Sequence, residues 1–162
     1  MTSRSLLLLL FAAACGSDTS TSDRSPDAGP DPHASGDAGV KEEDPVTICD
    51  QAKQHSDFAW LQEHVFTPSC ATAMCHAGPE PEVGLDLSAG ATYANLVNKG
   101  ASTVTGWTRV VPGSLATSYL AVSLGRAEGP PPRDGYMPLG ADPLCLEKLE
   151  AIERWILAGA QP

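Results

Sequence analysis

The segment 126–143, RAEGPPPRDGYMPLGADP, most constrains the fold of this chain. Gly129 is followed by three consecutive prolines, and a glycine or proline then follows every two or three residues. Proline lacks a backbone N–H and fixes φ, so neither a helix nor a central strand runs through such a segment. We therefore predict an irregular loop here. Loops of this length are uncommon in compact domains unless another feature organises them.

Helical spacing of apolar residues begins before this loop. The segment 56–67 repeats apolar side chains at Phe58, Leu61 and Val65, with Ser56 as the expected N-cap and Pro68 as the expected end. Residues 91–97, ATYANLV, predict a second, short helix that ends near Asn98.

Two further helices are expected nearer the C-terminus. In 114–124, Ser114 is the predicted cap and Gly125 the predicted stop. In 142–158, Asp142 is the predicted cap, Pro143 occupies the first turn and Gly159 ends the helix. Its expected apolar stripe is Leu146, Leu149, Ile152 and Ile156. With little strand signal, the pattern predicts an all-α domain of short helices and long loops arranged around a large apolar cofactor.

The N-terminal residues 1–14 predict an export signal. Arg4 precedes an apolar run that is too short to span a bilayer, and the run ends in small residues before Cys15. This arrangement resembles a bacterial lipoprotein signal, which implies cleavage before Cys15 and lipidation of that cysteine. Two or more acyl chains there would anchor the protein stably to a membrane of the cell envelope, facing the periplasm or on the outer membrane. The alternative is a secretory signal followed by an incidental cysteine.

The segment 15–46 is expected to be a disordered acidic tether, because it contains almost no large apolar side chain. Residues 16–46 hold eight acidic and two basic residues, whereas the expected domain, 47–162, holds twelve acidic and seven basic residues. The formal charge of −10 is therefore shared between the two parts. Because the sequence contains no basic patch, we do not expect nucleic acid as a partner.

The motif FTPSCATAMCH, residues 66–76, carries the chemistry of the chain. Covalent attachment of haem needs two thiols and an imidazole from one segment, usually spaced C-x-x-C-H. Here Cys70, Cys75 and His76 have the wider spacing C-x₄-C-H. The adjacency of Cys75 and His76 is the stringent requirement, while a longer gap between the cysteines can bulge outward.

The order of these features resembles the small cytochrome c family. A helix leads into Cys70, Cys75 and His76, a loop then carries Met137 followed by Pro138, and a terminal amphipathic helix carries Trp155. The closest likeness is to single-haem domains of exported bacterial lipoproteins with the widened motif, and it covers about residues 49–160.

This resemblance implies haem c held by Cys70 and Cys75, with His76 and Met137 as the axial ligands of the iron. It implies an electron carrier and not an enzyme, with redox proteins of the cell envelope as partners. By the same analogy Arg109 is expected near a haem propionate, and the carbonyl near Pro112 is expected to accept the second imidazole N–H of His76. Peroxidase-like chemistry is expected only if Met137 is not a ligand.

The remaining cysteines are then even in number. With Cys15 lipidated and Cys70 and Cys75 on haem, Cys49 and Cys145 are left in an oxidising compartment, and we predict that they form a disulfide.

Two alternatives remain open at this point. One is a haem-free envelope lipoprotein in which Cys70 pairs with Cys75 and the domain is a binding or structural module. The other is a metal site made of Cys70, Cys75 and His76, for which the sequence offers no convincing fourth ligand. His55 and His64 are rival imidazole ligands, and the position of His64 on a helix favours a partly exposed residue.

Overall fold

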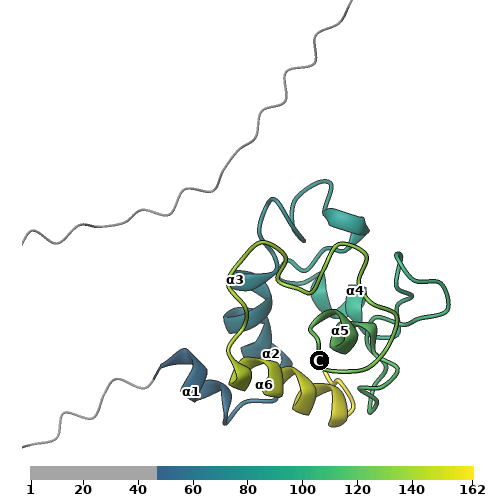
Figure 1. Ribbon diagram of the computed structural model, residues 1–162. Coiled ribbons are helices and arrows are strands. Elements are labelled where there is room, and N and C mark those ends of the chain that lie inside the picture. Colours follow the sequence, from purple (N-terminus) through teal and green to yellow (C-terminus); the bar gives the residue numbers. More distant parts are fainter. Residues whose placement is uncertain (1–46) are drawn as a thin grey trace, which may run out of the picture. The chain divides into compact units, whose positions relative to one another are not determined.

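The computed structural model of the chain describes residues 47–162 (Figure 1). The expected signal peptide, the lipidated Cys15 and the acidic segment 15–46 lie outside the described residues. Within 47–162, no helix is long and apolar enough to cross a bilayer. The elements in chain order are α1 (Ile48–Ala52), α2 (Phe58–Leu61), the π-helical η1 (Gln62–Phe66), α3 (Thr67–Ser69), the 3₁₀ turn η2 (Glu82–Gly84), α4 (Thr92–Leu96), α5 (Tyr119–Ser123) and α6 (Leu146–Leu157).

The first predicted helix is present as the continuous run α2, η1 and α3. Its cap is Asp57 and not Ser56, because the Asp57 side chain accepts a hydrogen bond from the backbone N–H of Trp60 at 2.8 Å. The run also continues through Pro68 to Ser69. Pro68 lies in the first turn of α3, directly after the π turn, and its fixed φ is compatible with a helix there.

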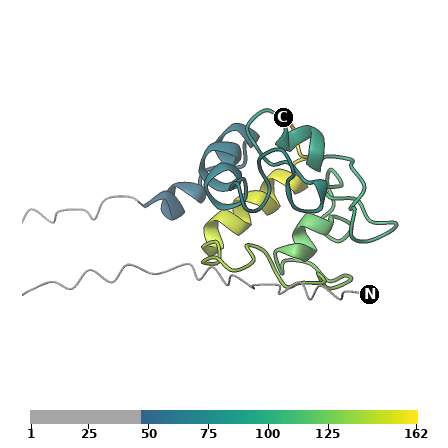
Figure 2. The same cartoon turned by 90° about the horizontal axis from the view of Figure 1, so that it is seen from above.

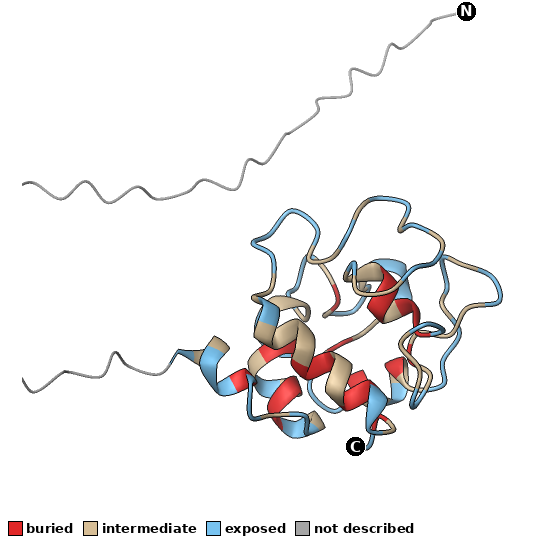
Figure 3. Ribbon diagram, turned by 60° about the horizontal axis from the view of Figure 1, so that its bottom comes forward, coloured by how far each residue is buried: buried red, intermediate tan, exposed pale blue. Residues whose placement is uncertain are grey.

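The C-terminal helix α6 forms the centre of the packed core. Seen from above, it runs between the blue segment α2–α3 and the green helix α5 (Figure 2). Its buried residues, red in Figure 3, are Ala151, Ile152, Trp155 and Ile156. The Trp155 ring lies 5.4 Å from that of Phe58 and 6.3 Å from that of Phe66, measured between ring centroids. Its indole N–H donates to the carbonyl of Gln161 at 2.7 Å, so the buried ring has no unpaired polar atom.

The predicted start of this helix is wrong by several residues. Asp142 does not cap it, and α6 begins at Leu146 with Cys145 in an extended conformation at the N-cap. Leu144 packs against the core and Cys145 is bonded to Cys49, so these two residues are fixed outside the helix. In consequence Leu146 is exposed and does not belong to the apolar stripe.

A disulfide joins Cys49 of α1 to Cys145, with the two Cα atoms 6.3 Å apart. This is the pair that the cysteine count predicts. A second link lies farther along α6, where a guanidinium nitrogen of Arg154 donates to the carbonyls of Ala52 and His55 at 2.6 and 3.0 Å. The short helix α1 is thereby fixed to α6 at both of its ends.

The helix α5 begins later than predicted. Residues 114–118 form turns, and α5 starts at Tyr119 after Ser118. The buried Ser118 hydroxyl donates to the carbonyl of Ser114 at 2.6 Å and accepts from the N–H of Val111 at 2.8 Å. These bonds compete with helix formation from Ser114, which therefore does not act as the cap.

The other predicted boundaries are confirmed. The helix expected at 91–97 is α4, and Asn98 follows it with φ of 55°. Gly125 follows α5 with φ of 69°, which glycine adopts without strain. The segment 126–143 contains no helix or strand. Strand pairing in the described residues is confined to isolated bridges between positions 97 and 118.

Candidate cofactor site

The cysteine motif forms a closed loop at the end of α3. The His76 N–H donates to the carbonyl of Cys70 at 3.2 Å, and the Cys75 N–H donates to that of Thr72 at 2.9 Å. The Leu87 N–H in turn donates to the carbonyl of His76 at 2.7 Å. Met74 points away from the protein and is 87% exposed. The extra residues of the widened motif therefore bulge outward, as predicted, while Cys70 and His76 remain close along the backbone.

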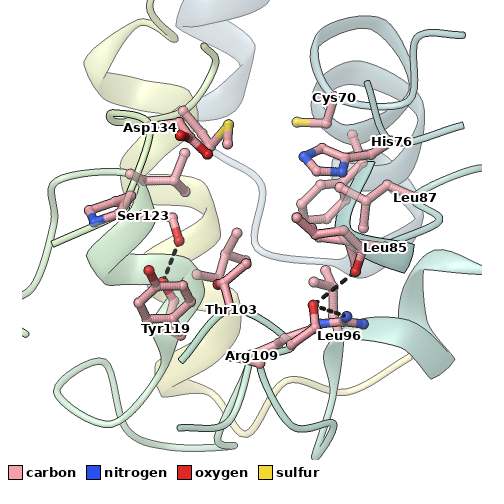
Figure 4. A pocket seen from close by; sticks show the side chains of 18 of the residues that line it. Cys70, His76, Leu85, Leu87, Leu96, Thr103, Arg109, Tyr119, Ser123 and Asp134 are labelled. Atoms are coloured by element: carbon pink, nitrogen blue, oxygen red, sulfur yellow. Dashed lines mark hydrogen bonds between the residues drawn. The ribbon is translucent and has the colours of Figure 1, made fainter. Parts of the chain in front are cut away.

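An apolar cavity, here called the inner cavity, opens beside this loop (Figure 4). Its walls surround about 970 Å³ of empty space, part of which is open to solvent. Most of its lining is apolar and includes Phe66, Leu85, Leu87, Leu96, Leu120, Leu124, Leu144 and Ile152. A second depression, the outer hollow, adjoins it, since Cys70, His76, Val83, Asp134 and Met137 line both.

His76 lies on one wall of the inner cavity next to Cys70, and Asp134 lies on the opposite wall (Figure 4). The imidazole is 9% exposed, and its Nδ1 is buried without a hydrogen-bond partner in the part of the chain that the structure describes. Burial lowers the pKa of His76, an effect opposed by the backbone carbonyls of Glu82 and Leu85. The neutral imidazole that burial favours is the form that binds metal ions.

The expected bond from His76 to the carbonyl near Pro112 is absent in this structure. The backbone of His76 is held instead to the segment that follows it, through the bond with Leu87. The carbonyls that influence its ring accordingly belong to Glu82 and Leu85, which are in that segment. The carbonyl acceptor that the analogy expects near Pro112 is therefore not found at the ring, whose Nδ1 has no partner among the described residues.

Met137 reaches the same cavity from the proline-rich loop. Its side chain is half-buried and lines both the inner cavity and the outer hollow. Its N–H donates to the carbonyl of Ser123 at 2.8 Å, which attaches the loop to the end of α5. The structure thus brings together His76 and Met137, which are sixty-one residues apart in the sequence.

Arg109 supplies a positive charge to the lining, at the bottom of the cavity in Figure 4; the other charged lining residues are Arg133 and Asp134, which pair with each other. Its guanidinium donates to the carbonyl of Asn95 at 2.9 Å and to the Ser102 hydroxyl at 3.4 Å. Among the described residues no carboxylate lies within 4.0 Å of it. Burial lowers the pKa of this guanidinium, though arginine stays charged. A partly buried cation without a counter-ion favours a ligand that carries an acidic group.

Both motif cysteines are free thiols in the structure. Cys70 lines both the inner cavity and the outer hollow, whereas Cys75 lines only the outer hollow. Burial, with a smaller effect of Cys75, raises the pKa of the Cys70 thiol to about 11, and Lys148 opposes the shift. The disulfide that the haem-free alternative expects between these two cysteines is therefore not present.

A compact metal site is not favoured either. Among residues 47–162, only Cys49, Cys145 and Glu147 bring three potential ligand atoms within 4.8 Å of one another. Two of these residues are joined in the disulfide. Cys70, Cys75 and His76 do not bring their ligand atoms together in this way, although all three line the outer hollow.

The two rival histidines lie outside the cavity lining. The ring of His55 stacks on that of Trp60 with 4.6 Å between centroids, and its Nδ1 lies 2.9 Å from the carboxylate of Asp57. His64 packs on the same Trp60 at 4.9 Å. Sequence reasoning missed Tyr119, Ser123 and Asp134 as lining residues; only the proximity of Asp134 to Met137 along the loop pointed to any of them.

Comparisons of this chain with protein-family models, with curated proteins and with solved structures find no match. The interpretation of the site therefore depends on its own residues and their arrangement.

Proposed function

We propose that residues 47–162 form an all-α, cytochrome c-like domain that holds one haem covalently and carries single electrons. Cys70 and Cys75 would form the thioether bonds, and His76 and Met137 would be the axial ligands of the iron. The observation that carries this proposal is that Cys70, His76 and Met137 line both the inner cavity and the adjoining outer hollow, which Cys75 also lines.

The donor set fits a haem in three respects. A buried imidazole with an unpaired nitrogen is available as a ligand. The apolar walls suit the faces of a porphyrin, and the Arg109 guanidinium suits its propionates. Two free thiols lie beside the imidazole on the same loop.

A haem iron with imidazole and thioether ligands supplies one-electron chemistry at a raised reduction potential. The chain itself would position the two ligands, exclude water with the leucine-rich lining and neutralise an acidic group with Arg109. Because both axial positions would be filled, we propose an electron carrier and not an enzyme.

The proposed cellular location follows from residues 1–46, which lie outside the part of the chain that the structure describes. Export by residues 1–14 and lipidation of Cys15 would place the domain in the cell envelope, attached to a membrane by 15–46. The proposed partners are redox proteins of that compartment. Mass spectrometry of the mature protein tests this point, because a lipidated Cys15 adds the mass of its acyl chains to the N-terminal peptide.

The first experiment is expression with a cytochrome c maturation system, followed by a reduced-minus-oxidised visible spectrum and a haem-stained denaturing gel. We expect a c-type spectrum and haem that stays on the gel. Cys75→Ala should lose the covalent stain, and His76→Ala should lose the six-coordinate spectrum. His64→Ala is the matched control, because His64 does not line the cavity, and it should leave both signals intact. A chain that takes up no haem in this system contradicts the proposal.

A further inference from the structure

The outer hollow is surrounded by exposed apolar side chains. Six large hydrophobic residues are exposed in the described part of the chain, and three of them line this hollow. These are Met74, Val83 and Leu139, which are 87, 44 and 50% exposed. Met74 and Leu139 come from two separate loops and Val83 from η2. Single exposed apolar residues are ordinary, whereas a cluster of them around a depression marks a binding surface.

The charges of the hollow have one sign. Its lining contains Glu82, Asp134 and Asp142 and no lysine or arginine. Asp134 pairs with the adjacent Arg133 at 3.1 Å, whereas Glu82 and Asp142 take part in no ion pair among residues 47–162. A lining that combines exposed apolar side chains with unpaired charges is the composition of a protein interface.

The negative sign of these charges determines which kind of molecule can bind in the outer hollow. A second copy of this chain would bring carboxylates against carboxylates, and the upstream segment 16–46, with eight acidic residues and two basic ones, would be repelled as well. Nucleic acid is excluded for the same reason. A protein that carries lysine or arginine around an apolar centre fits both features of the hollow.

We propose that the outer hollow, with Met74, Val83 and Leu139 as its exposed apolar residues and Glu82 and Asp142 as its charges, is the docking surface for a basic partner protein. Cys70, Cys75 and His76 also line the hollow, so the partner would contact the residues that hold the cofactor. That the partner is a redox protein rests on the proposed function. Met74 lies in the gap between the two cysteines, so the widened motif itself contributes to this surface.

Binding of two probe proteins to the full-length chain tests the proposal. The probes are a basic c-type cytochrome and an acidic flavodoxin, and the dissociation constant of each is measured by calorimetry at low and at high ionic strength. We expect the basic probe to bind more tightly and to weaken with added salt. The double variant Glu82→Gln/Asp142→Asn should weaken its binding about fivefold at low salt. Leu139→Ser should also weaken it about fivefold.

Matched controls separate a local surface from the general negative charge of the chain. Glu63→Gln/Glu128→Gln removes the same formal charge from exposed residues outside the hollow, and Leu157→Ser removes a comparable exposed leucine from the end of α6. Both should change the dissociation constant less than twofold. Three results would overturn the proposal. The two charge variants could weaken binding of the basic probe equally, the two leucine variants could weaken it equally, or the chain could bind the flavodoxin more tightly than the basic probe.

The haem content of the same preparations separates this proposal from the proposed function. A haem-loaded chain that binds neither probe leaves electron transfer standing and removes the docking surface. A chain without haem whose binding to the basic probe depends on Glu82, Asp142 and Leu139 supports the surface and removes the assignment as an electron carrier.

Discussion

Met137 would determine the reduction potential of the proposed site, because its thioether is the soft ligand that stabilises ferrous iron. We predict that Met137→His leaves haem covalently bound but lowers the midpoint potential, since imidazole stabilises the ferric state better. Potentiometric titration of the purified variant measures the shift. His64→Ala should keep the native potential, and an unchanged potential in Met137→His would show that Met137 is not a ligand.

The Cys70 thiol provides a second test at the scale of single residues, in chain produced without haem. Its pKa of about 11, raised mainly by burial, leaves about one thiol in a thousand ionised at pH 8. Because the thiolate is the nucleophile, we predict that iodoacetamide labels Cys70 slowly at neutral pH and much faster as the pH rises above about 10. Peptide mass spectrometry measures the labelling. The urea-unfolded chain is the control, and rapid labelling of folded Cys70 at pH 7 would contradict its burial.

Among the helices, α1 depends most on a single covalent link. The disulfide between Cys49 and Cys145 closes a loop with a sequence separation of 96. In the chain-entropy model such a loop contributes about 4.7 kcal/mol to stability. We predict that Cys49→Ser/Cys145→Ser lowers the free energy of unfolding by about that amount, measured by urea denaturation. Reductant should destabilise the parent chain and leave this variant unchanged; a difference below about 1 kcal/mol would contradict the prediction.

The errors of sequence prediction at this scale are concentrated at helix starts. Ser114 and Asp142 both have the residue type of a cap, but the helices begin at Tyr119 and Leu146. In each case a specific contact overrides the local helix propensity. The hydroxyl of Ser118 sets the start of α5, and the disulfide at Cys145 sets the start of α6. Helix ends marked by glycine were predictable, because a positive φ is a local property of the backbone.

The motif and loop residues of the candidate site were predictable from the sequence, whereas the lining that tertiary packing supplies was not. Cys70, Cys75, His76 and Met137 follow from their residue types and order. The environment of the His76 ring, near Glu82 and Leu85, depends on how residues 77–87 turn back, and proline or glycine at several of these positions leaves that path open to many conformations.

For the molecule as a whole, the inner cavity lies beside the main core, since Phe66, Leu87, Leu96 and Ile152 belong to both. A haem in this cavity would complete the core. We therefore predict that the haem-loaded chain is more stable than Cys70→Ser/Cys75→Ser purified without haem, by roughly 3 kcal/mol or more, as for a saturating ligand of the native state. Thermal unfolding followed by circular dichroism measures the difference. Equal stability of the two forms would place the haem outside the core.

The attachment of α1 to α6 also determines how the domain responds to mechanical load. The chain before Thr47 leads directly into α1, so a pull on that chain reaches Cys49 first and passes through the disulfide into α6. The segment from Cys70 to His76 is bypassed by this path. Tension from the upstream chain would thus be borne by the packed helix, and the geometry around His76 would remain unstrained.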